Sequence, residues 1–202
     1  MTIVLINGAK RSGKDFTANL LKEKLSVNHT TDILAFATPL KQIVADTFGI
    51  SLEELEMFKN EYQDYGVEVK VYPNNQPSSV LQYTNFREIL QRFGTEGMKP
   101  IFGKSVWADI MADKCFDSES DFIFIPDFRF NVESDAIKKL DADYADFKVV
   151  TLKIRNDDID TTDAHASERE LDDYKFDYTI DNTGHTDKLS DYVDSFINTH
   201  LV

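Results

Sequence analysis

Short apolar runs alternate along the chain with segments whose apolar positions recur at helical spacing. The runs are rich in β-branched and aromatic residues, which is typical of strands buried on both faces of a sheet. The strands expected from them are Ile3–Ile6, Ile33–Ala37, Phe122–Ile125, Val149–Ile154 and Tyr178–Ile180. The expected helices are Lys14–Leu25, Thr38–Phe48, a short one opening at Ser51, Asn85–Phe93, Ser105–Phe116, Glu133–Leu140 and Lys188–His200. This alternation predicts an α/β fold with a mainly parallel sheet flanked by helices.

Several helix ends carry their own signals. Thr38 before Pro39 predicts a capped helix start, and Gly49 predicts its end. Ser51 with Glu54 matches a capping box. The glycines of Gly94-Thr-Glu-Gly97 predict that the helix before them is interrupted there.

Two stretches lack a clear period. Residues 60–82 are rich in turn-forming residues, although Val67–Tyr72 alternates and predicts a strand or hairpin arm. We interpret residues 60–82 as an excursion at the edge of a site. The whole chain, residues 1–202, is expected to be one domain, since a chain of this length forms one good core. Residues 155–173 are polar and acidic, and we interpret them as a lid-like loop.

The first expected strand leads into a loop bracketed by glycines. Gly8 and Gly13 are followed at once by Lys14 and a helical pattern, which gives strand, G-x-x-x-x-G-K, helix. Glycines let consecutive backbone N–H groups point at one anion, and the helix N-terminus adds partial positive charge. Lys14 can reach the terminal phosphates of a nucleotide. The alternative is a plain strand-to-helix turn with two glycines, but spacing, lysine and context together favour a phosphate-binding loop.

Asp15 stands where Ser or Thr normally binds magnesium in such loops. Its carboxylate could bind Mg²⁺ directly or through water, or it could orient other groups of the loop. Thr17 is a further oxygen ligand nearby.

The composition is that of a globular, strongly acidic protein, with 42% hydrophobic residues, 29% charged residues and a net charge of −14. Such a surface repels a phosphate backbone, which argues against DNA or RNA as a partner. No run approaches the roughly 18 apolar residues of a membrane span, and the N-terminus leads straight into a strand without a signal peptide. The single Cys115 excludes an intrachain disulfide and fits a reducing cytosol, so we expect a cytoplasmic protein.

The cations gather near the motifs, which suits a small phosphorylated ligand bound within a negative surface. They are Lys10, Arg11, Lys14, Lys41, Arg87, Arg92, Arg129 and Arg155. For Arg92 we favour an ordinary surface position.

In a parallel sheet, ligands bind at the carboxyl ends of the strands, where Asp127 and Arg155 are expected. Asp127 would hold Mg²⁺ or accept a hydrogen bond, and Arg129 and Arg87 would clamp phosphates.

Trp107 leaves two interpretations open. It could stack on a base or close the acceptor site, but a lone Trp on a helix is more often part of the core.

The loop Gly8-Ala-Lys-Arg-Ser-Gly-Lys-Asp15, with Asp directly after the lysine, resembles that of the bacteriophage deoxynucleoside monophosphate kinases. Other matching stretches are Phe36-Ala-Thr-Pro-Leu-Lys41, Arg87-Glu-Ile-Leu-Gln-Arg-Phe-Gly-Thr95, Trp107, Pro126-Asp-Phe-Arg129 with Glu133, Ser167-Glu168 and Asp181-Asn-Thr-Gly184. They run in order along most of the chain and thin at residues 51–84, which resemble a short version of a variable insertion at the acceptor site. The resemblance implies a P-loop kinase fold with a lid, and the host cytoplasm as location if a phage encodes the chain.

The resemblance also implies the reaction: transfer of the ATP γ-phosphate to a deoxynucleoside monophosphate, a dNMP, with Mg²⁺. By position, the residues around the ATP phosphates would be Arg11, Gly13, Lys14, Asp15, Phe16 and Thr17. Those around the monophosphate would be Lys10, Phe36, Ala37, Lys41, Arg87, Gln91, Gly94, Thr95, Trp107, Arg129 and Glu133. Catalysis would involve Lys14, Asp127, Arg129 and Arg155, and Mg²⁺ would meet Asp15 and Asp127.

Alternatives to this reaction stay open. Animal phosphomevalonate kinases resemble the same Lys-Arg/Ser-Gly-Lys-Asp-Phe loop, so a kinase for another small phosphate ester is the second hypothesis. The third is a nucleotide-binding regulator or assembly protein that hydrolyses little, which Asp15 in the Ser/Thr position favours. Base preference, ribose selectivity and the closing arginine (Arg155 or Arg169) do not follow from the sequence, and a homodimer stays open.

Overall fold

The computed structural model describes residues 1–60, 67–71, 80–159, 170–184 and 188–201. The chain forms two compact units, one of Met1–Phe36 with Trp107–Val202 and one of Ala37–Val106. The 51–84 insertion and the 155–173 lid both lie partly outside the described residues. Arg169 lies outside them altogether. The single-domain organisation and these two segments therefore stay predictions.

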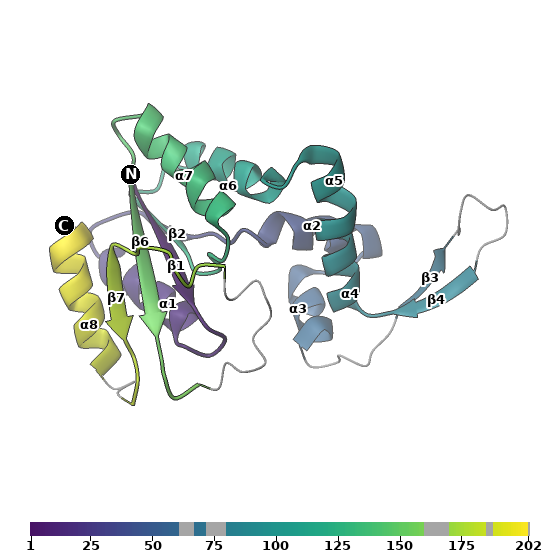
Figure 1. Ribbon diagram of the computed structural model, residues 1–202, viewed down its shortest axis with the longest axis horizontal. Coiled ribbons are helices and arrows are strands. Elements are labelled where there is room, and N and C mark those ends of the chain that lie inside the picture. Colours follow the sequence, from purple (N-terminus) through teal and green to yellow (C-terminus); the bar gives the residue numbers. More distant parts are fainter. Residues whose placement is uncertain (61–66, 72–79, 160–169, 185–187, 202) are drawn as a thin grey trace. The chain divides into compact units, whose positions relative to one another are not determined.

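The first unit is built on a five-stranded sheet in which every neighbouring pair is parallel (Figure 1). Its strands are β1 (Thr2–Gly8), β2 (Thr31–Ile33), β5 (Phe122–Ile125), β6 (Lys148–Arg155) and β7 (Tyr178–Asp181). Their order is β2-β5-β1-β6-β7, so β1 lies at the centre. In register, Leu5 pairs with Ile125 of β5, and Gly8 pairs with Ile154 of β6. The sheet confirms the predicted α/β class.

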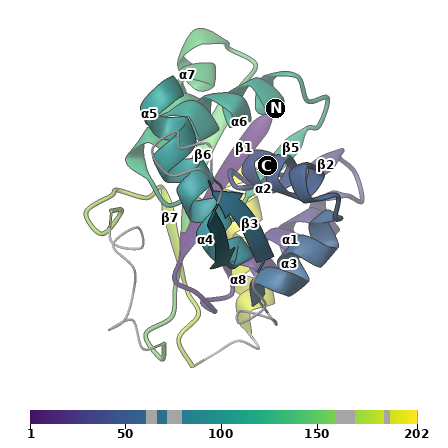
Figure 2. The same cartoon turned by 90° about the vertical axis from the view of Figure 1, so that its right-hand side faces the viewer.

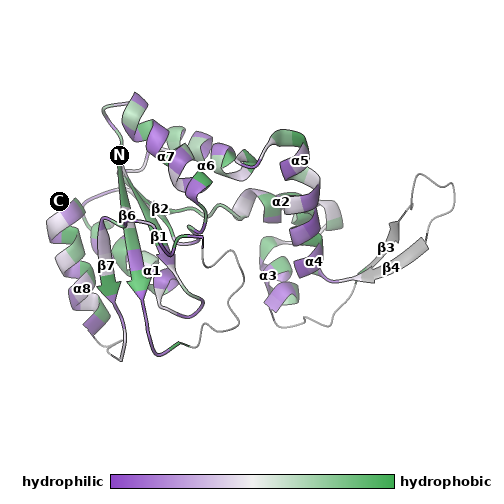
Figure 3. Ribbon diagram, in the orientation of Figure 1, coloured by the Kyte–Doolittle hydropathy of each residue, from purple (hydrophilic) through white to green (hydrophobic). Residues whose placement is uncertain are grey.

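Helices cover both faces of this sheet, and the central strands β1 and β5 carry buried apolar side chains on both faces. Val4 and Ile6 belong to the core under α1 (Lys14–Leu25) and α8 (Leu189–Phe196). Ile3 and Leu5 belong to the core under α6 (Val106–Phe116) and α7 (Asn131–Asp143). Strands with two buried faces read as continuous apolar runs, which is how β1 and β5 appear in the sequence. Figure 3 shows the strand β1 coloured mostly as hydrophobic.

The second unit is a small helical cluster with a hairpin. Figures 1 and 2 show its helices grouped together. They are α2 (Thr38–Phe48), α3 (Leu52–Asn60), α4 (Phe86–Gln91), a π-helical segment (Arg92–Met98) and α5 (Lys99–Phe102). The antiparallel hairpin consists of β3 (Val67–Val71) and β4 (Val80–Thr84). The core of the unit includes Val44, Leu55, Phe86 and Leu90. None of the helices in the described ranges combines the length and the apolar character that a membrane span requires.

Four local predictions differ from the structure. The second strand is Thr31–Ile33 and stops short of the predicted end at Ala37. Beyond it, the Phe36 N–H donates to the side chain of Asp127 (2.9 Å) and not to a backbone carbonyl of β5. Thr38 is the first residue of α2, and the cap position before it is Ala37, with no side-chain cap bond. The stretch Gly94–Gly97 continues helically, as part of the π-helical segment. The last predicted helix likewise ends in a π-helical segment, Ile197–Leu201, after α8.

Candidate active site

The carboxyl ends of the parallel strands lie at one edge of the sheet, and the candidate residues of the first unit follow them there. β1 leads into α1 on one face, whereas its neighbour β5 leads into α7 on the other face. Adjacent strands whose helices go to opposite faces form a topological switch point, where open α/β sheets bind ligands. The glycine loop and Asp127 follow these two strands.

The loop between β1 and α1 needs its glycines for different reasons. A Cβ on Gly8 would lie 2.4 Å from Ser12 Oγ and 2.9 Å from the Ile154 carbonyl oxygen, so no side chain fits there. Gly13 has φ of 101°, a left-handed conformation that costs glycine little. Arg11 also has a positive φ, 70°. The loop is therefore tightly curled directly before the helix begins.

The start of α1 presents main-chain donors and a lysine. The first bond of the helical ladder runs from the Thr17 N–H to the Gly13 carbonyl (2.8 Å), so the N–H groups of Lys14, Asp15 and Phe16 precede that ladder. Lys14 is buried except for 8% of its surface, and its Nζ lies 3.5 Å from a carboxylate oxygen of exposed Asp15. Thr17 is fully buried and donates its hydroxyl to the Gly13 carbonyl (2.9 Å).

Asp127 follows β5 and lies beside the end of β1. Its Oδ1 accepts the Phe36 N–H at 2.9 Å. Asn7 of β1 donates its side-chain amide to the Phe128 carbonyl, also at 2.9 Å, which ties the segment after β5 to the strand that carries the glycine loop. These bonds hold the carboxylate at the switch point between the two strands.

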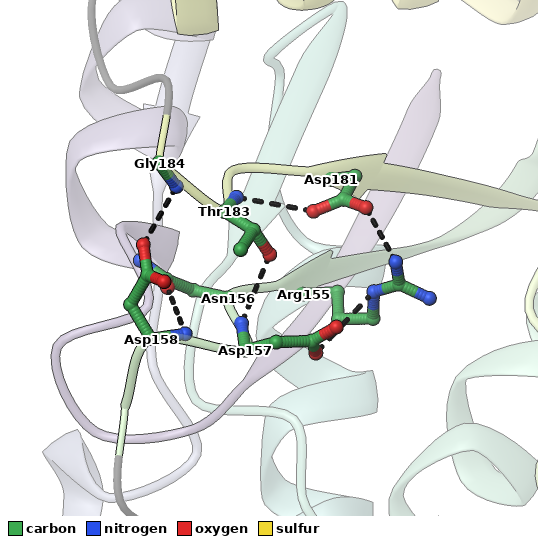
Figure 4. A network of polar contacts seen from close by, with 7 residues as sticks. All are labelled: Arg155, Asn156, Asp157, Asp158, Asp181, Thr183 and Gly184. Carbon is green, nitrogen blue, oxygen red and sulfur yellow. Dashed lines mark hydrogen bonds and ion pairs between the residues drawn. The ribbon is translucent and has the colours of Figure 1, made fainter.

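Arg155 ends β6 and pairs with two carboxylates. Its guanidinium donates to Asp181 at the end of β7, and its Nε lies 3.4 Å from an Asp157 oxygen (Figure 4). All three side chains are about half exposed. Exposed pairs of this kind contribute little to stability, so they can rearrange at low cost.

The chain matches the sequence model described as deoxynucleotide monophosphate kinase over residues 53–193, well over half of its 202 residues. The chain belongs to the deoxynucleotide monophosphate kinase family. This match does not include the glycine loop at Gly8–Lys14, so the loop and the family are two separate observations that agree. It does include Arg87, Trp107, Asp127 and Arg155. The family expected from the sequence is confirmed.

Comparison with solved structures gives a weaker likeness. A plasmid partition protein from Borrelia burgdorferi is similar at 13% identity and a TM-score of 0.38, over 98% of both chains. No protein with a curated description matches the chain.

Arg129 and Glu133, both expected at the acceptor in this kinase family, lie at the start of α7. The Glu133 carboxylate accepts the N–H of Arg129 (2.7 Å) and of Phe130 (3.0 Å), which fixes the backbone from which Arg129 projects. Burial raises the pKa of Glu133 to about 8; the two N–H donors oppose the rise and the charge of Asp127 adds to it. Glu133 thus acts on the backbone of Arg129.

The other candidate residues of the first unit divide by exposure. Phe36 and Trp107 are 4% and 9% exposed, and Phe36 is part of the core under α6 and α7. Lys10 and Arg11 are exposed on the glycine loop. Phe16 is 60% exposed on the first turn of α1, which is unusual for a large apolar side chain. An exposed aromatic beside the helix start offers a flat surface to a ligand.

In the second unit, cations surround one carboxylate. Lys41 of α2 contacts Glu56 at 2.6 Å, and Lys59 of α3 contacts the other oxygen of Glu56. Burial lowers the pKa of Lys59, with the charges of Lys41 and Arg87 adding to the effect and Glu56 opposing it. Two lysines on one carboxylate, with Arg87 acting electrostatically on Lys59, leave an excess of positive charge in an acidic protein. We call Lys41, Lys59, Arg87 and Glu56 the lysine cluster.

The remaining acceptor candidates of the second unit lie at its helix ends. Ala37 caps α2, and Gln91 ends α4 with its side chain exposed. Gly94 and Thr95 lie in the π-helical segment. A Cβ on Gly94 would lie 2.7 Å from a Leu40 methyl group, so the close packing there requires glycine. π-helical turns often occur at functional sites, which agrees with the predicted role of this segment.

Sequence reasoning missed three residues of these sites. Lys59 and Glu56 carry no motif signal, because they fall in the stretch where the resemblance thins. Asn182 lies against the glycine loop: its side-chain amide donates to the Ser12 carbonyl at 2.9 Å. The stretch Asp181–Gly184 matches a motif in the sequence, but the separation of 170 positions between Ser12 and Asn182 hides the contact from any local pattern.

Proposed function

We propose that the protein is an ATP-dependent deoxynucleoside monophosphate kinase, which transfers the γ-phosphoryl group of ATP to a dNMP and yields ADP and the deoxynucleoside diphosphate. The observation that carries this proposal is the curled glycine loop, with left-handed Gly13 and enclosed Lys14, at the switch point of a sheet whose chain belongs to this kinase family. A tight anion cradle with a lysine is what a nucleotide triphosphate requires.

The ATP phosphates would be bound by the loop and the first turn of α1. The residues are Arg11, Gly13, Lys14, Asp15, Phe16 and Thr17. Main-chain N–H groups before the helical ladder supply hydrogen bonds, and the Lys14 ammonium supplies charge. Thr17 would act through Gly13, because its buried hydroxyl already donates to the Gly13 carbonyl.

The dNMP phosphate would be bound by cations. In the second unit the lysine cluster has the excess positive charge that a phosphate monoester neutralises, and Arg87 offers a bidentate fork. In the first unit Arg129 projects from a backbone that Glu133 holds. Lys10, Phe36, Ala37, Gln91, Gly94, Thr95 and Trp107 are the further acceptor candidates.

Magnesium fits the carboxylates at the strand ends. Mg²⁺ is usually held by one or two carboxylates together with substrate phosphates, and Asp15 and Asp127 follow the adjacent strands β1 and β5. When bound, the ion neutralises charge on the phosphate oxygens. Lys14, Arg129 and Arg155 would add positive charge around the transferring group, since phosphoryl transfer depends on positioning and charge neutralisation.

The test is a coupled assay of ADP release with ATP and Mg²⁺, run against the four dNMPs, the matching ribonucleotides and phosphomevalonate. We expect turnover on one or more dNMPs, which also gives the base preference. Turnover on phosphomevalonate alone would assign the chain to the second hypothesis. ATP binding without turnover on any acceptor would favour the nucleotide-binding regulator.

A variant of the glycine loop separates catalysis from folding. Lys14→Ala should lower kcat/KM by roughly 100-fold or more, the scale of a lost charge contact in a transition state. Its melting temperature should change little. The matched control is Lys22→Ala in the last turn of the same helix, which should keep full activity. Equal losses of activity and melting temperature in Lys14→Ala would show that Lys14 is structural.

A further inference from the structure

The stretch Asp181–Gly184 has no role in the proposed reaction, yet it follows β7 at the same edge of the sheet as the glycine loop. β6 separates β7 from β1 in the strand order, so a contact with the loop has to reach past the end of β6. Asn182 makes that contact. It is 2% exposed, and its amide donates to the Ser12 carbonyl at 2.9 Å in a buried setting.

The bond acts on the peptide between Ser12 and Gly13. A trans peptide is planar, and its carbonyl and N–H point in opposite directions. Because Asn182 holds the Ser12 carbonyl, the Gly13 N–H is directed away from Asn182. Rotation of this peptide would turn that N–H and change the left-handed φ of Gly13, which is 101° and directly precedes Lys14. The amide therefore selects one of the loop's possible shapes.

The space around Gly13 and Ser12 shows how closely Asn182 packs against the loop. A Cβ on Gly13 would lie 2.8 Å from Asn182 Nδ2 and 3.6 Å from a Leu189 methyl group of α8. Ser12 is fully buried. Its hydroxyl oxygen and Asn182 Oδ1 are buried without a hydrogen-bond partner among the described residues. An unsatisfied buried polar atom destabilises the folded state, so stability alone is a poor reason for Asn at this position.

Asn182 is itself held at both ends of its turn. Its backbone N–H donates to the Arg155 carbonyl at 2.7 Å. After it, Thr183 Oγ1 accepts the Asp157 N–H (2.9 Å) and Asp158 accepts the Gly184 N–H (2.7 Å) (Figure 4). The Thr183 N–H donates to Asp181, which pairs with Arg155. These bonds connect the ends of β6 and β7, and the bond from the Asn182 N–H to the Arg155 carbonyl sets the place from which the Asn182 side chain starts.

We infer that Asn182 is a positioning residue for the phosphate-binding loop, which it holds in the shape that presents the Gly13 N–H and Lys14 to a nucleotide phosphate. The inference rests on the proposed function for the identity of the ligand, but the loop contact itself does not depend on turnover. Asn182 acts through Ser12 and Gly13 and does not need to touch the nucleotide.

The test compares Asn182→Asp and Asn182→Ala with Thr183→Ala, a control in the same turn whose side chain contacts Asp157 and not the glycine loop. Asn182→Asp keeps the shape but replaces the donor with an acceptor. Four quantities are measured: the Kd of ADP with Mg²⁺ by calorimetry, the steady-state KM and kcat, and the amide NMR shift of Gly13 without ligand. Melting temperatures show whether each variant is folded.

We expect both Asn182 variants to weaken ADP binding by about 10- to 100-fold, the scale of a misplaced group in a site. The Gly13 amide shift should change without ligand, the KM of the dNMP should stay within about twofold, and Thr183→Ala should resemble the wild type. If Asn182→Asp does not fold because it buries a charge, the Asn182→Ala variant alone tests the inference. Unchanged ADP affinity and an unchanged Gly13 shift in a folded Asn182→Ala would overturn the inference.

The inference and the proposed function fail differently. If the wild-type protein turns over no dNMP but Asn182→Ala loses ADP affinity, Asn182 positions the loop of a nucleotide-binding protein and the kinase proposal fails alone. If the wild-type protein turns over a dNMP and Asn182→Ala matches it in every measurement, the inference fails alone. A lower melting temperature with unchanged ADP affinity would show that Asn182 is only structural.

Discussion

Glu133 illustrates how one buried side chain makes stability depend on pH. Burial raises its pKa to about 8 in the folded protein, from an ordinary value of 4.5. Between these values the unfolded chain has released the proton that the folded chain still binds. Stability from this group is therefore fully present below about pH 4.5 and is lost as pH rises through about 8.

Glu133→Gln should remove this pH dependence. Glutamine keeps an oxygen that can accept the N–H groups of Arg129 and Phe130, but it cannot ionise. We expect the difference in unfolding free energy between the variant and the wild type to grow in favour of the variant from about pH 5 to pH 9. Urea denaturation without nucleotide or metal measures it. A parallel Glu23→Gln variant, at an exposed position of α1, is the control, and a flat difference for Glu133→Gln would refute the assignment.

At the scale of elements, the helix boundaries that a glycine marks lie at the residues predicted from the sequence. α1 begins after left-handed Gly13, and α2 ends before left-handed Gly49. The capping box of Ser51 and Glu54 forms as predicted, with bonds of 2.7 and 3.1 Å. These features depend on neighbours within a few residues, and local chemistry is what a sequence pattern contains.

Elements that depend on distant contacts were not predictable in this way. β2 ends at Ile33, and beyond it the Phe36 N–H bonds to the side chain of Asp127, 91 residues away, in place of a backbone carbonyl. The π-helical segment contains two glycines that read as a break, but Gly94 serves close packing against Leu40. The same limit applies to the site, because the glycine loop is a local motif whereas its support by Asn182 joins opposite ends of the chain.

The lysine cluster gives a prediction for the second unit. Lys59→Met removes one cation while keeping an apolar stem of similar length. We expect the KM of the dNMP to rise by roughly 10- to 100-fold, as for the loss of one charge-assisted hydrogen bond, with the KM of ATP unchanged. Steady-state kinetics with each substrate varied measures both constants. Lys104→Met, at an exposed position of the same unit, is the control. Equal effects on both substrates, or none, would contradict a role for Lys59 at the acceptor phosphate.

At the scale of the whole molecule, charge and ligand are complementary. The net charge is −14, yet cations follow the strand ends of the first unit and surround Glu56 in the second. A negative surface repels polyanions, and local positive sites still attract a small phosphate ester. The substrate class of the proposed kinase is therefore consistent with the overall charge, and added salt should weaken substrate binding.

Cys115 supplies a probe for opening of the first unit. It is the only cysteine of the chain, it is a fully buried residue of α6, and burial raises the pKa of its thiol to about 12. The thiolate is the reactive form, so a thiol reagent at pH 8 should label the folded protein only when the unit opens. Protein in urea should react at once and give one thiol per chain.

The rate of this labelling tests whether nucleotide binding stabilises the unit that carries the glycine loop. A ligand that binds only the folded state lowers the open population by a factor of about 1 + [L]/Kd. ATP with Mg²⁺ at about 100 times its Kd should therefore slow the labelling of Cys115 roughly 100-fold. Lys14→Ala, measured at the same ATP concentration, should lose most of this protection because its affinity for the phosphates is lower. Fast labelling of the wild-type protein without ligand would contradict the buried position of the thiol. Slow labelling at a rate that ATP does not change would show that nucleotide binding does not stabilise this unit.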